Sequence, residues 1–279
     1  MNVQEELDHL RSGETFQGDI RPFVAPTSEA LSELGAELRQ NPSAAMREQV
    51  VKILVNLAVE TDPFHCLRHR RILSILLHDT PVAIDEAYRL ALDRIALLAS
   101  PSVLVEFGTT LGKLVSQAPL PELFLVVAKA KAVEALPAMQ VLEKDPRWAQ
   151  DAHFRIAQAA LGDQSEEDFF TKRFLATTDP REKMDFAIPV SQIGTASALK
   201  VLAEEMRSPL VLRIPQAFEM SVRIEIARAI HFDFPEQPFL LQIRSDEDYE
   251  RIELFCQLQF GAQWTRPRPA FLASKSFQT

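Results

Sequence analysis

Apolar residues recur from residue 27 onward with the spacing of one face of an α-helix. In residues 27–40, Leu31, Leu34 and Leu38 occupy positions i, i+3 and i+7, and a second apolar stripe follows in residues 43–57. Because this spacing brings the side chains together on one side of a helix with 3.6 residues per turn, it predicts amphipathic helices that each bury one face.

Prolines indicate where many of these helices begin. A residue that can cap a helix stands directly before proline in Asp62-Pro63, Thr80-Pro81, Ser100-Pro101, Asp145-Pro146 and Asp179-Pro180. Proline suits the first helical turn because its missing N–H would have no intrahelical partner there. These pairs predict helices that include about residues 63–78, 81–99, 101–117 and 146–161. Further starts are predicted where a capping residue precedes an acid by three positions, at Ser165, Asp179 and Ser245.

The composition agrees with a helical protein. The chain has 279 residues, of which 47% are hydrophobic and 25% charged, the proportions of an ordinary globular protein. Only 8 residues are glycine, whereas a β-sandwich or barrel uses many tight turns that favour glycine. Two of the glycines, Gly162 and Gly261, stand where helices are predicted to end. We therefore predict an all-α fold.

Segments of similar sequence recur in the second half of the chain. RIAQAALG at residues 155–162 is similar to IEIARAIH at residues 224–231, and their separation corresponds to two periods of roughly 35 residues. Leu161-Gly162 also matches Ile193-Gly194, about one such period further along the chain. A drifting period of this size, with one helix pair per period, is typical of repeat proteins in which each pair packs only against its neighbours.

These repeats resemble a known pattern. The stretch REKMDFAIPVSQIGTASALKVLAEEMRSP at residues 181–209, followed by SVRIEIARAI at residues 221–230, resembles the HEAT-repeat pattern in its Ile-Gly helix end, its AL-x-x-L helix and its Val-Arg helix start. The resemblance extends over residues 146–261. It is weaker over residues 27–145, which lack the glycine helix end and the Val-Arg helix start. It implies a right-handed α-solenoid of antiparallel helix pairs. HEAT-like families bind proteins, nucleic acids or cofactors on their concave faces, and a few are enzymes, so no reaction is implied.

We expect four parts in the chain. Residues 1–26 have no sustained apolar period, which predicts a flexible or loosely docked N-terminal segment. Degenerate helical repeats follow in residues 27–145, and HEAT-like repeats with one insertion occupy residues 146–261. Residues 262–279 form a tail after the last predicted helix.

The insertion, SPLVLRIPQAFEMS at residues 208–221, is the strongest irregularity. Its two prolines prevent a helix, and its apolar residues surround Arg213. A link of this length inside a compact array is uncommon and often functional, which predicts partner contact through Leu212, Arg213 and Phe218. The alternative is a loop that folds back over one end of the repeat stack.

A basic cluster occurs in FHCLRHRRIL, residues 64–73. Arg68, Arg70 and Arg71 could bind an acidic partner or could form an ordinary helix surface. His65 and His69 have the i, i+4 spacing at which two imidazoles can share a metal. No further ligand pair lies nearby in sequence, so we expect no metal site.

Catalytic patterns are weak throughout. Gly108-Thr-Thr-Leu-Gly112-Lys113 has too few residues between its glycines for a phosphate loop, and close helix packing explains it better. The acidic trios at residues 166–168 and 246–248 follow serines at predicted helix starts, where the helix dipole favours negative charge. We therefore expect no catalysis and no cofactor.

The tail combines aromatic and basic residues with two prolines. Trp264, Arg266, Arg268 and Phe271 lie in GAQWTRPRPAFLASKSFQT, residues 261–279. Alternating arginine and proline favour an extended backbone that a partner groove can bind, with Trp264 and Arg266 as contacts. The interpretation we favour is that Trp264 and Phe271 cover the exposed core of the final repeat.

Charge limits the partners. The chain has 30 basic and 39 acidic residues, a net charge of −9, and nucleic-acid-binding chains usually have a basic surplus. The N-terminus lacks the basic start of a secretory signal, and the longest apolar run is the short stretch at 123–128. We expect a cytoplasmic protein that inserts into no membrane, with Cys66 and Cys256 as reduced thiols.

The function predicted from these observations is a non-catalytic protein–protein interaction scaffold or adaptor. One alternative is an enzyme on the same scaffold, similar to the HEAT-like DNA glycosylases or the bilin lyases. A second is a nucleic-acid-binding module that uses a local basic face made of Arg68–Arg71 with Arg207, Arg213, Arg223 and Arg228.

Overall fold

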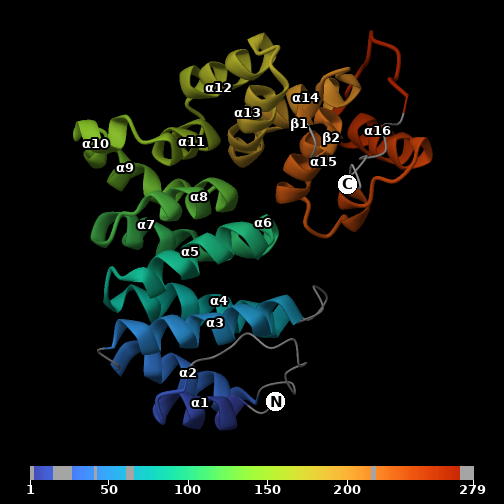
Figure 1. Ribbon diagram of the computed structural model, residues 1–279. Helices are drawn as coiled ribbons and strands as arrows, with labels where there is room; N and C mark the ends of the chain where they lie inside the picture. The colour runs from blue at the N-terminus through green and yellow to red at the C-terminus, as the bar shows by residue number, and fades with distance from the viewer. Residues whose placement is uncertain (1–2, 15–26, 41–42, 61–65, 215–217, 271–279) are drawn as a thin grey trace. The chain divides into compact units, whose positions relative to one another are not determined.

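The computed structural model is mostly helical, which confirms the all-α prediction (Figure 1). The residues that it describes are 3–14, 27–40, 43–60, 66–214 and 218–270. The chain divides into two compact units, Met1–Trp148 and Ala149–Thr279. Among the described residues, no helix combines the length and the apolar character needed to cross a bilayer.

Unit 1 stacks its helices in chain order, and helices close in sequence pack on one another (Figure 1). Its α-helices are α1 (Val3–Arg11), α2 (Ser28–Gln40), α3 (Ala44–Glu60), α4 (Cys66–His78), α5 (Glu86–Leu98), α6 (Pro101–Leu104), α7 (Gly108–Gln117), α8 (Pro121–Ala130) and α9 (Leu136–Leu142). Short 3-10 turns, η1 (Thr80–Val82), η2 (Val105–Phe107) and η3 (Val133–Ala135), connect some of them. The short helix α10 (Pro146–Ala149) lies at the boundary between the units.

Unit 2 has the same local organisation with one hairpin inserted. Its helices are α11 (Ala152–Ala160), α12 (Gln164–Ala176), α13 (Pro180–Ile193), α14 (Ala196–Glu204), α15 (Val222–Asp233) and α16 (Asp246–Phe260), with 3-10 turns η4 (Glu205–Arg207) and η5 (Pro238–Leu241). Strands β1 (Val211–Ile214) and β2 (Phe218–Ser221) pair antiparallel between η4 and α15.

Several helix ends lie where the sequence predicted them. The Asp179 carboxylate accepts hydrogen bonds from two backbone N–H groups at the start of α13, and the Ser245 hydroxyl accepts one at the start of α16. Gly261 ends α16 with a φ of 65°, and Gly162 follows α11 with a φ of 110°. Glycine adopts these left-handed conformations without a steric cost, which is why it suits both positions.

Two predicted helices begin later than expected. The helix predicted over residues 81–99 begins at Glu86, because the Asp85 carboxylate accepts a hydrogen bond from the backbone N–H of Tyr88 at 3.1 Å. The helix predicted over residues 146–161 is interrupted, and Asp151 caps its second part, α11. In both segments a second capping residue follows the proline, and it takes the cap of the longer helix.

Helix α12 is capped by Asp163 rather than by Ser165, the predicted cap. The Asp163 carboxylate accepts hydrogen bonds from the Ser165 hydroxyl at 2.7 Å and from the backbone N–H groups of Ser165 and Glu166. The bond from the Ser165 side chain, with the two backbone bonds, holds the pKa of Asp163 below its ordinary value.

The N-terminal segment contains a helix where only a loosely docked lead-in was expected. Val3, Leu7 and Leu10 of α1 are buried, and their spacing of four and three positions forms one apolar face. The Arg11 guanidinium also pairs with the Glu37 carboxylate of α2, with Nε and Oε1 2.9 Å apart. Residues 15–26 of this segment lie outside the described residues.

One helix pair occurs twice, once in each unit. Helices α2 and α12 both have 13 residues, and they span positions 28–40 and 164–176. The next helices, α3 and α13, begin at positions 44 and 180, so both helices of the pair are shifted by the same amount. Buried positions coincide too, since Leu34 and Leu38 of α2 correspond to Phe170 and Phe174 of α12. The shift equals four periods of about 34 residues, a common length for helical repeats.

A buried cation joins the two helices of each pair in the same way. In α3, Arg47 donates to the carbonyl of Leu38, near the end of α2. In α13, Nζ of Lys183 donates to the carbonyl of Phe174 at 2.8 Å, near the end of α12. Each donor lies nine positions after its acceptor. The cation satisfies a carbonyl that has no partner in its own helix and lies beside the negative end of the helix dipole.

Two glycines let η3 lie directly against α7. A Cβ atom at Gly112 would lie 2.6 Å from the backbone carbonyl oxygen of Glu134, whereas a Cβ atom at Gly108 would meet only the carboxylate end of the Glu134 side chain. The segment with partial likeness to a phosphate loop lies in a helix and not after a strand. Its glycines therefore serve close packing, as predicted.

Candidate protein-interaction site

The last helix, α16, has apolar residues on more than one side in its C-terminal half. Ile252 and Cys256 are buried against the rest of unit 2, whereas Leu254 and Leu258 on another side are 55% and 79% exposed. A surface helix normally buries its apolar side chains on one face and keeps polar residues on the other. This part of α16 is therefore covered within its own unit on one side only.

A network of phenylalanines continues this apolar surface. Phe255 of α16 packs edge-to-face with Phe234, Phe239 and Phe260, with ring centroids 5.4, 5.6 and 5.8 Å apart. All four rings are only half-buried. Phe234 follows α15 and Phe239 lies in η5, so the network joins three consecutive elements. Such clusters on a protein surface commonly mark binding sites.

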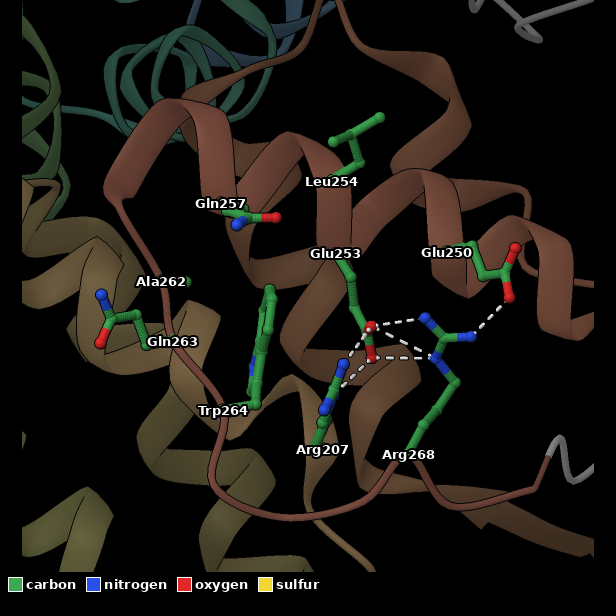
Figure 2. Close-up of a pocket in the computed structure, with 9 residues that line it drawn as sticks. All are labelled: Arg207, Glu250, Glu253, Leu254, Gln257, Ala262, Gln263, Trp264 and Arg268. Carbon is green, nitrogen blue, oxygen red and sulfur yellow. Dashed lines mark hydrogen bonds and ion pairs between the residues drawn. The ribbon is translucent and has the colours of Figure 1, made fainter.

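A pocket of about 440 Å³ lies beside α16 (Figure 2). Its other wall is residues 261–270, which follow α16 and which we call the strap. The lining residues come from α16, from the strap and from η4: Glu250, Glu253, Leu254, Gln257, Ala262, Gln263, Trp264, Arg268 and Arg207. Figure 2 shows the strap as an arc that leaves the end of α16 and carries Trp264 and Arg268.

Glu253 binds two arginines at the base of the pocket. Its carboxylate accepts from Nη2 of Arg207 at 3.0 Å and from Nη2 of Arg268 at 2.7 Å, with further bonds from both Nε atoms. Arg268 also donates to Glu250 at 2.6 Å (Figure 2). Planar guanidinium groups suit carboxylates because they donate two parallel hydrogen bonds. Glu253 therefore fastens the strap to α16 and to η4.

The arginines also set the protonation of Glu253. Burial raises the pKa of this carboxyl group, but the hydrogen bonds from Arg268 and Arg207 outweigh burial and hold the pKa below its ordinary value. The hydrogen bonds that Arg268 donates to Glu253 also raise the pKa of Arg268 above its ordinary value. The cluster therefore stays charged at neutral pH.

Protonation of Glu253 is expected to release the strap. Because the pKa is lower in the folded chain, the stabilisation is present above the ordinary value of 4.5 and is lost as pH falls through the folded value. Fluorescence of Trp264, recorded in a Trp148→Phe background, should change only below pH 4.5. The Glu253→Gln variant should show the acid spectrum already at neutral pH, and an unchanged spectrum there would contradict this role.

Trp264 docks the strap on its own unit. Its indole Nε1 donates to the carbonyl of Ala203 at 3.0 Å, and the Arg207 guanidinium lies 4.8 Å from its ring centroid. Arg266 pairs with Glu205 at 3.3 Å, and its carbonyl accepts from Arg207. Trp264 was predicted as a partner contact or as a cover of the last repeat, and Arg266 as a partner contact; in the structure they bind α14 and η4. Phe271 lies outside the described residues.

Other groups at the pocket keep their hydrogen-bonding capacity. Gln257 and Gln263 are exposed, and within the described part of the chain their side chains make no hydrogen bond. The backbone groups of residues 263–265 likewise form no hydrogen bond there. The pocket thus combines the paired charges of Glu253, Arg207 and Arg268 with amide groups that can still bind a ligand.

Comparisons with known proteins leave this site unassigned. No family model, curated protein or solved structure matches the chain. The function therefore has to be argued from the geometry alone.

The predicted insertion site forms the β-hairpin. Leu212 pairs with Met220 and Arg213 with Glu219, and an ion pair of 3.2 Å joins the side chains of the second pair. The backbone of Phe218 pairs with Ile214, while the Phe218 side chain lies outside the described residues. Alternate residues of a strand point to opposite faces, so Leu212 and Arg213 point to different sides of the hairpin. Partner contact through this hairpin stays a prediction.

The predicted basic cluster makes bonds within unit 1. Arg70 pairs with Glu106 at 2.6 Å, and Arg71 donates to the carbonyl of Ser28 and to the Ser32 hydroxyl. The side chains of His65, Arg68 and His69 lie outside the described residues. Arg70 and Arg71 thus join α4 to neighbouring elements.

Several of the remaining acidic groups are paired with basic side chains. Over the described residues, no group of three or more histidines, cysteines or acids is arranged to hold a metal ion. In the acidic trios, Glu166 pairs with Arg155 at 2.8 Å and Asp168 with Lys172 at 2.6 Å. Burial raises the pKa of the Cys256 thiol to about 12, which makes it a poor nucleophile.

Most residues of the pocket were not predicted from the sequence. Glu250, Glu253, Leu254 and Gln257 all lie on α16, a helix that was predicted only as the end of the repeats. The available signal was the apolar residues at 252, 254, 255, 256 and 258, which no single helix face can hold.

Proposed function

We propose that this chain is a non-catalytic protein-interaction scaffold, a HEAT-like solenoid of helix pairs that binds a protein partner at α16. The observation that carries the proposal is the apolar C-terminal half of α16, where Leu254 and Leu258 stay exposed beside half-buried phenylalanines. Burying this surface in a partner would contribute about 25 cal/mol for each Å² of apolar area removed from water.

The repeated helix pair supports a scaffold. Helices α12–α13 repeat α2–α3 at a constant shift along the chain, and each pair is joined by a buried cation. Repeat proteins present extended surfaces on which partners bind. The exposed Leu254 and Leu258 of α16 favour a binding role for this helix.

The arginines named for nucleic-acid binding support a protein partner instead. Arg213 and Arg228 pair with Glu219 and Glu225 on the protein surface, and Arg207 pairs with Glu253. Arg223 is buried over the ring of Tyr249. Phosphate groups would have to displace these carboxylates, whereas an apolar protein surface would not.

Replacing Leu258 by glutamate is expected to abolish partner binding without unfolding the chain. The side chain is 79% exposed, so the change adds a charge to the binding surface and costs the folded state little. Affinity capture from cells of the source organism, with quantitative mass spectrometry, measures the loss. The captured partner should then bind the purified wild-type protein and fail to bind the variant.

Leu175→Glu is the matched control. Leu175 lies on α12 of the same unit and is 50% exposed. This variant should keep the partners of the wild-type chain. If Leu258→Glu retains the same partners as Leu175→Glu, α16 is not the binding surface and the proposal fails.

A further inference from the structure

We infer that the pocket between α16 and the strap holds an extended peptide segment of the partner that carries a basic side chain. The inference rests on the proposed scaffold function and names the kind of partner segment that it binds. It follows from the size of the pocket, from its amide groups and from its charges.

The pocket is the size of a ligand site and is open to chain-like ligands. Its volume of about 440 Å³ lies within the range of about 300–1,000 Å³ that is typical of binding pockets. It lies along α16 and the strap rather than inside the core (Figure 2). A segment of a few residues fits such a groove with both of its ends leaving to solvent.

The uncommitted groups of the pocket match a peptide backbone. Each peptide unit offers one donor and one acceptor, and a glutamine side chain offers both as well. Gln257 projects from α16 and Gln263 from the strap, so they can bind the two sides of one segment. The unpaired backbone of residues 263–265 adds an edge along which an extended segment can form hydrogen bonds.

Apolar side chains give this segment a second contact. Leu254 and the Trp264 ring both line the pocket, and Leu258 lies one turn beyond Leu254 on α16. In an extended peptide, successive side chains point in opposite directions. One apolar residue of the partner can therefore contact Leu254 while its neighbours face the charged end.

The charges favour a basic side chain over an acidic one. Glu250 is 60% exposed at its side chain, and only one of its oxygens accepts from Arg268. Arg207 and Arg268 are already paired with Glu253, so an acidic ligand would compete with a bound carboxylate. Along α16, five acidic residues stand against the single basic residue Arg251. A lysine or arginine beside Glu250 therefore meets a favourable field.

A display selection tests this inference directly. Phage-displayed random dodecapeptides are selected on the full chain, and the enriched peptides are synthesised and titrated by fluorescence anisotropy. We expect enriched peptides with a basic residue next to apolar ones. Removing both pocket amides in Gln257→Ala/Gln263→Ala should weaken their binding by about tenfold or more, because each amide supplies hydrogen bonds to the ligand. Glu250→Gln should weaken it by roughly threefold or more.

Matched controls separate binding from folding. Gln259→Ala removes an exposed amide of α16 that does not line the pocket, and Asp185→Asn removes an exposed carboxylate of α13. Both should bind the peptides as the wild-type chain does, and all variants should melt together by circular dichroism.

Two outcomes overturn the inference. The first is no enrichment, or enrichment of acidic peptides. The second is peptides that bind the pocket variants and the wild-type chain equally. If such peptides or the captured partner still lose binding in Leu258→Glu, the scaffold proposal stands and only the peptide pocket is wrong. If Leu258→Glu also leaves partner capture unchanged, both proposals fail.

Discussion

Gly112→Ala is expected to unfold unit 1 at temperatures at which Gly108→Ala leaves it folded. The new Cβ atom at position 112 would lie 2.6 Å from the backbone carbonyl oxygen of Glu134, so η3 or α7 has to move as a whole. Alanine favours the helix by about 1 kcal/mol over glycine, but the overpacking outweighs this. We expect a net loss of about 2–4 kcal/mol in the free energy of unfolding.

Gly108→Ala is the matched control on the same helix face. Its Cβ atom would meet only the end of the Glu134 side chain, which is exposed and can rotate away. We expect its free energy of unfolding to stay within about 1 kcal/mol of the wild-type value. Urea denaturation followed by circular dichroism measures both. Equal midpoints for the two variants would show that η3 does not rest on Gly112 in solution.

Arg47→Met is expected to destabilise unit 1 by about 3–5 kcal/mol. Besides Leu38, the buried guanidinium binds the carbonyl of Thr80 at 2.5 Å and the carboxylate of Asp85 at 2.8 Å. Methionine fills a similar volume but removes the donor to the Leu38 and Thr80 carbonyls and to one oxygen of Asp85, in a site from which water is largely excluded. Arg47→Lys keeps the positive charge but loses the planar guanidinium with its several N–H donors, so it should restore only part of the stability.

Two comparisons test whether the effect comes from the buried position. Arg89→Met removes an ion pair of 3.6 Å between the exposed Arg89 and the half-buried Glu122, and should cost less than about 1 kcal/mol. Lys183→Met removes the equivalent cation of unit 2, which also pairs with Glu205 at 3.1 Å. Hydrogen exchange read by mass spectrometry should rise in unit 1 for Arg47→Met and in unit 2 for Lys183→Met. Exchange that rises no more in Arg47→Met than in Arg89→Met would contradict this role.

The sequence predicted helix ends well where the cap depends on only a few neighbouring residues. A helix cap involves residues within about four positions of one another, which explains the success at Asp179 and Ser245. The predicted cap was wrong at α12, where Asp163 and Ser165 are two positions apart and both could cap the helix. Asp163 takes the cap and also accepts a hydrogen bond from the Ser165 hydroxyl. Near Asp85 and Asp151, a proline signal and a second cap also compete, and packing of the longer helix decides between them.

The candidate site was harder to predict because its residues are far apart in sequence. Arg207 and Glu253 are 46 positions apart, and Glu253 and Arg268 are 15 apart. With 30 basic and 39 acidic residues in the chain, no pattern selects these three as partners. In the insertion, the prolines excluded a helix, but the pairing of Val211 with Ser221 sets the register of a hairpin that was not predicted.

The sequence by itself determined that the chain is helical and where many helices start and end, because these properties depend on spacing and on neighbouring residues. The tertiary structure decided which side of α16 is covered. It also decided that Glu253 binds two arginines and that the strap closes a pocket. These features arise from contacts between residues that are distant in sequence. An apolar side chain belongs to the core when a neighbouring element covers it, and to the surface when none does.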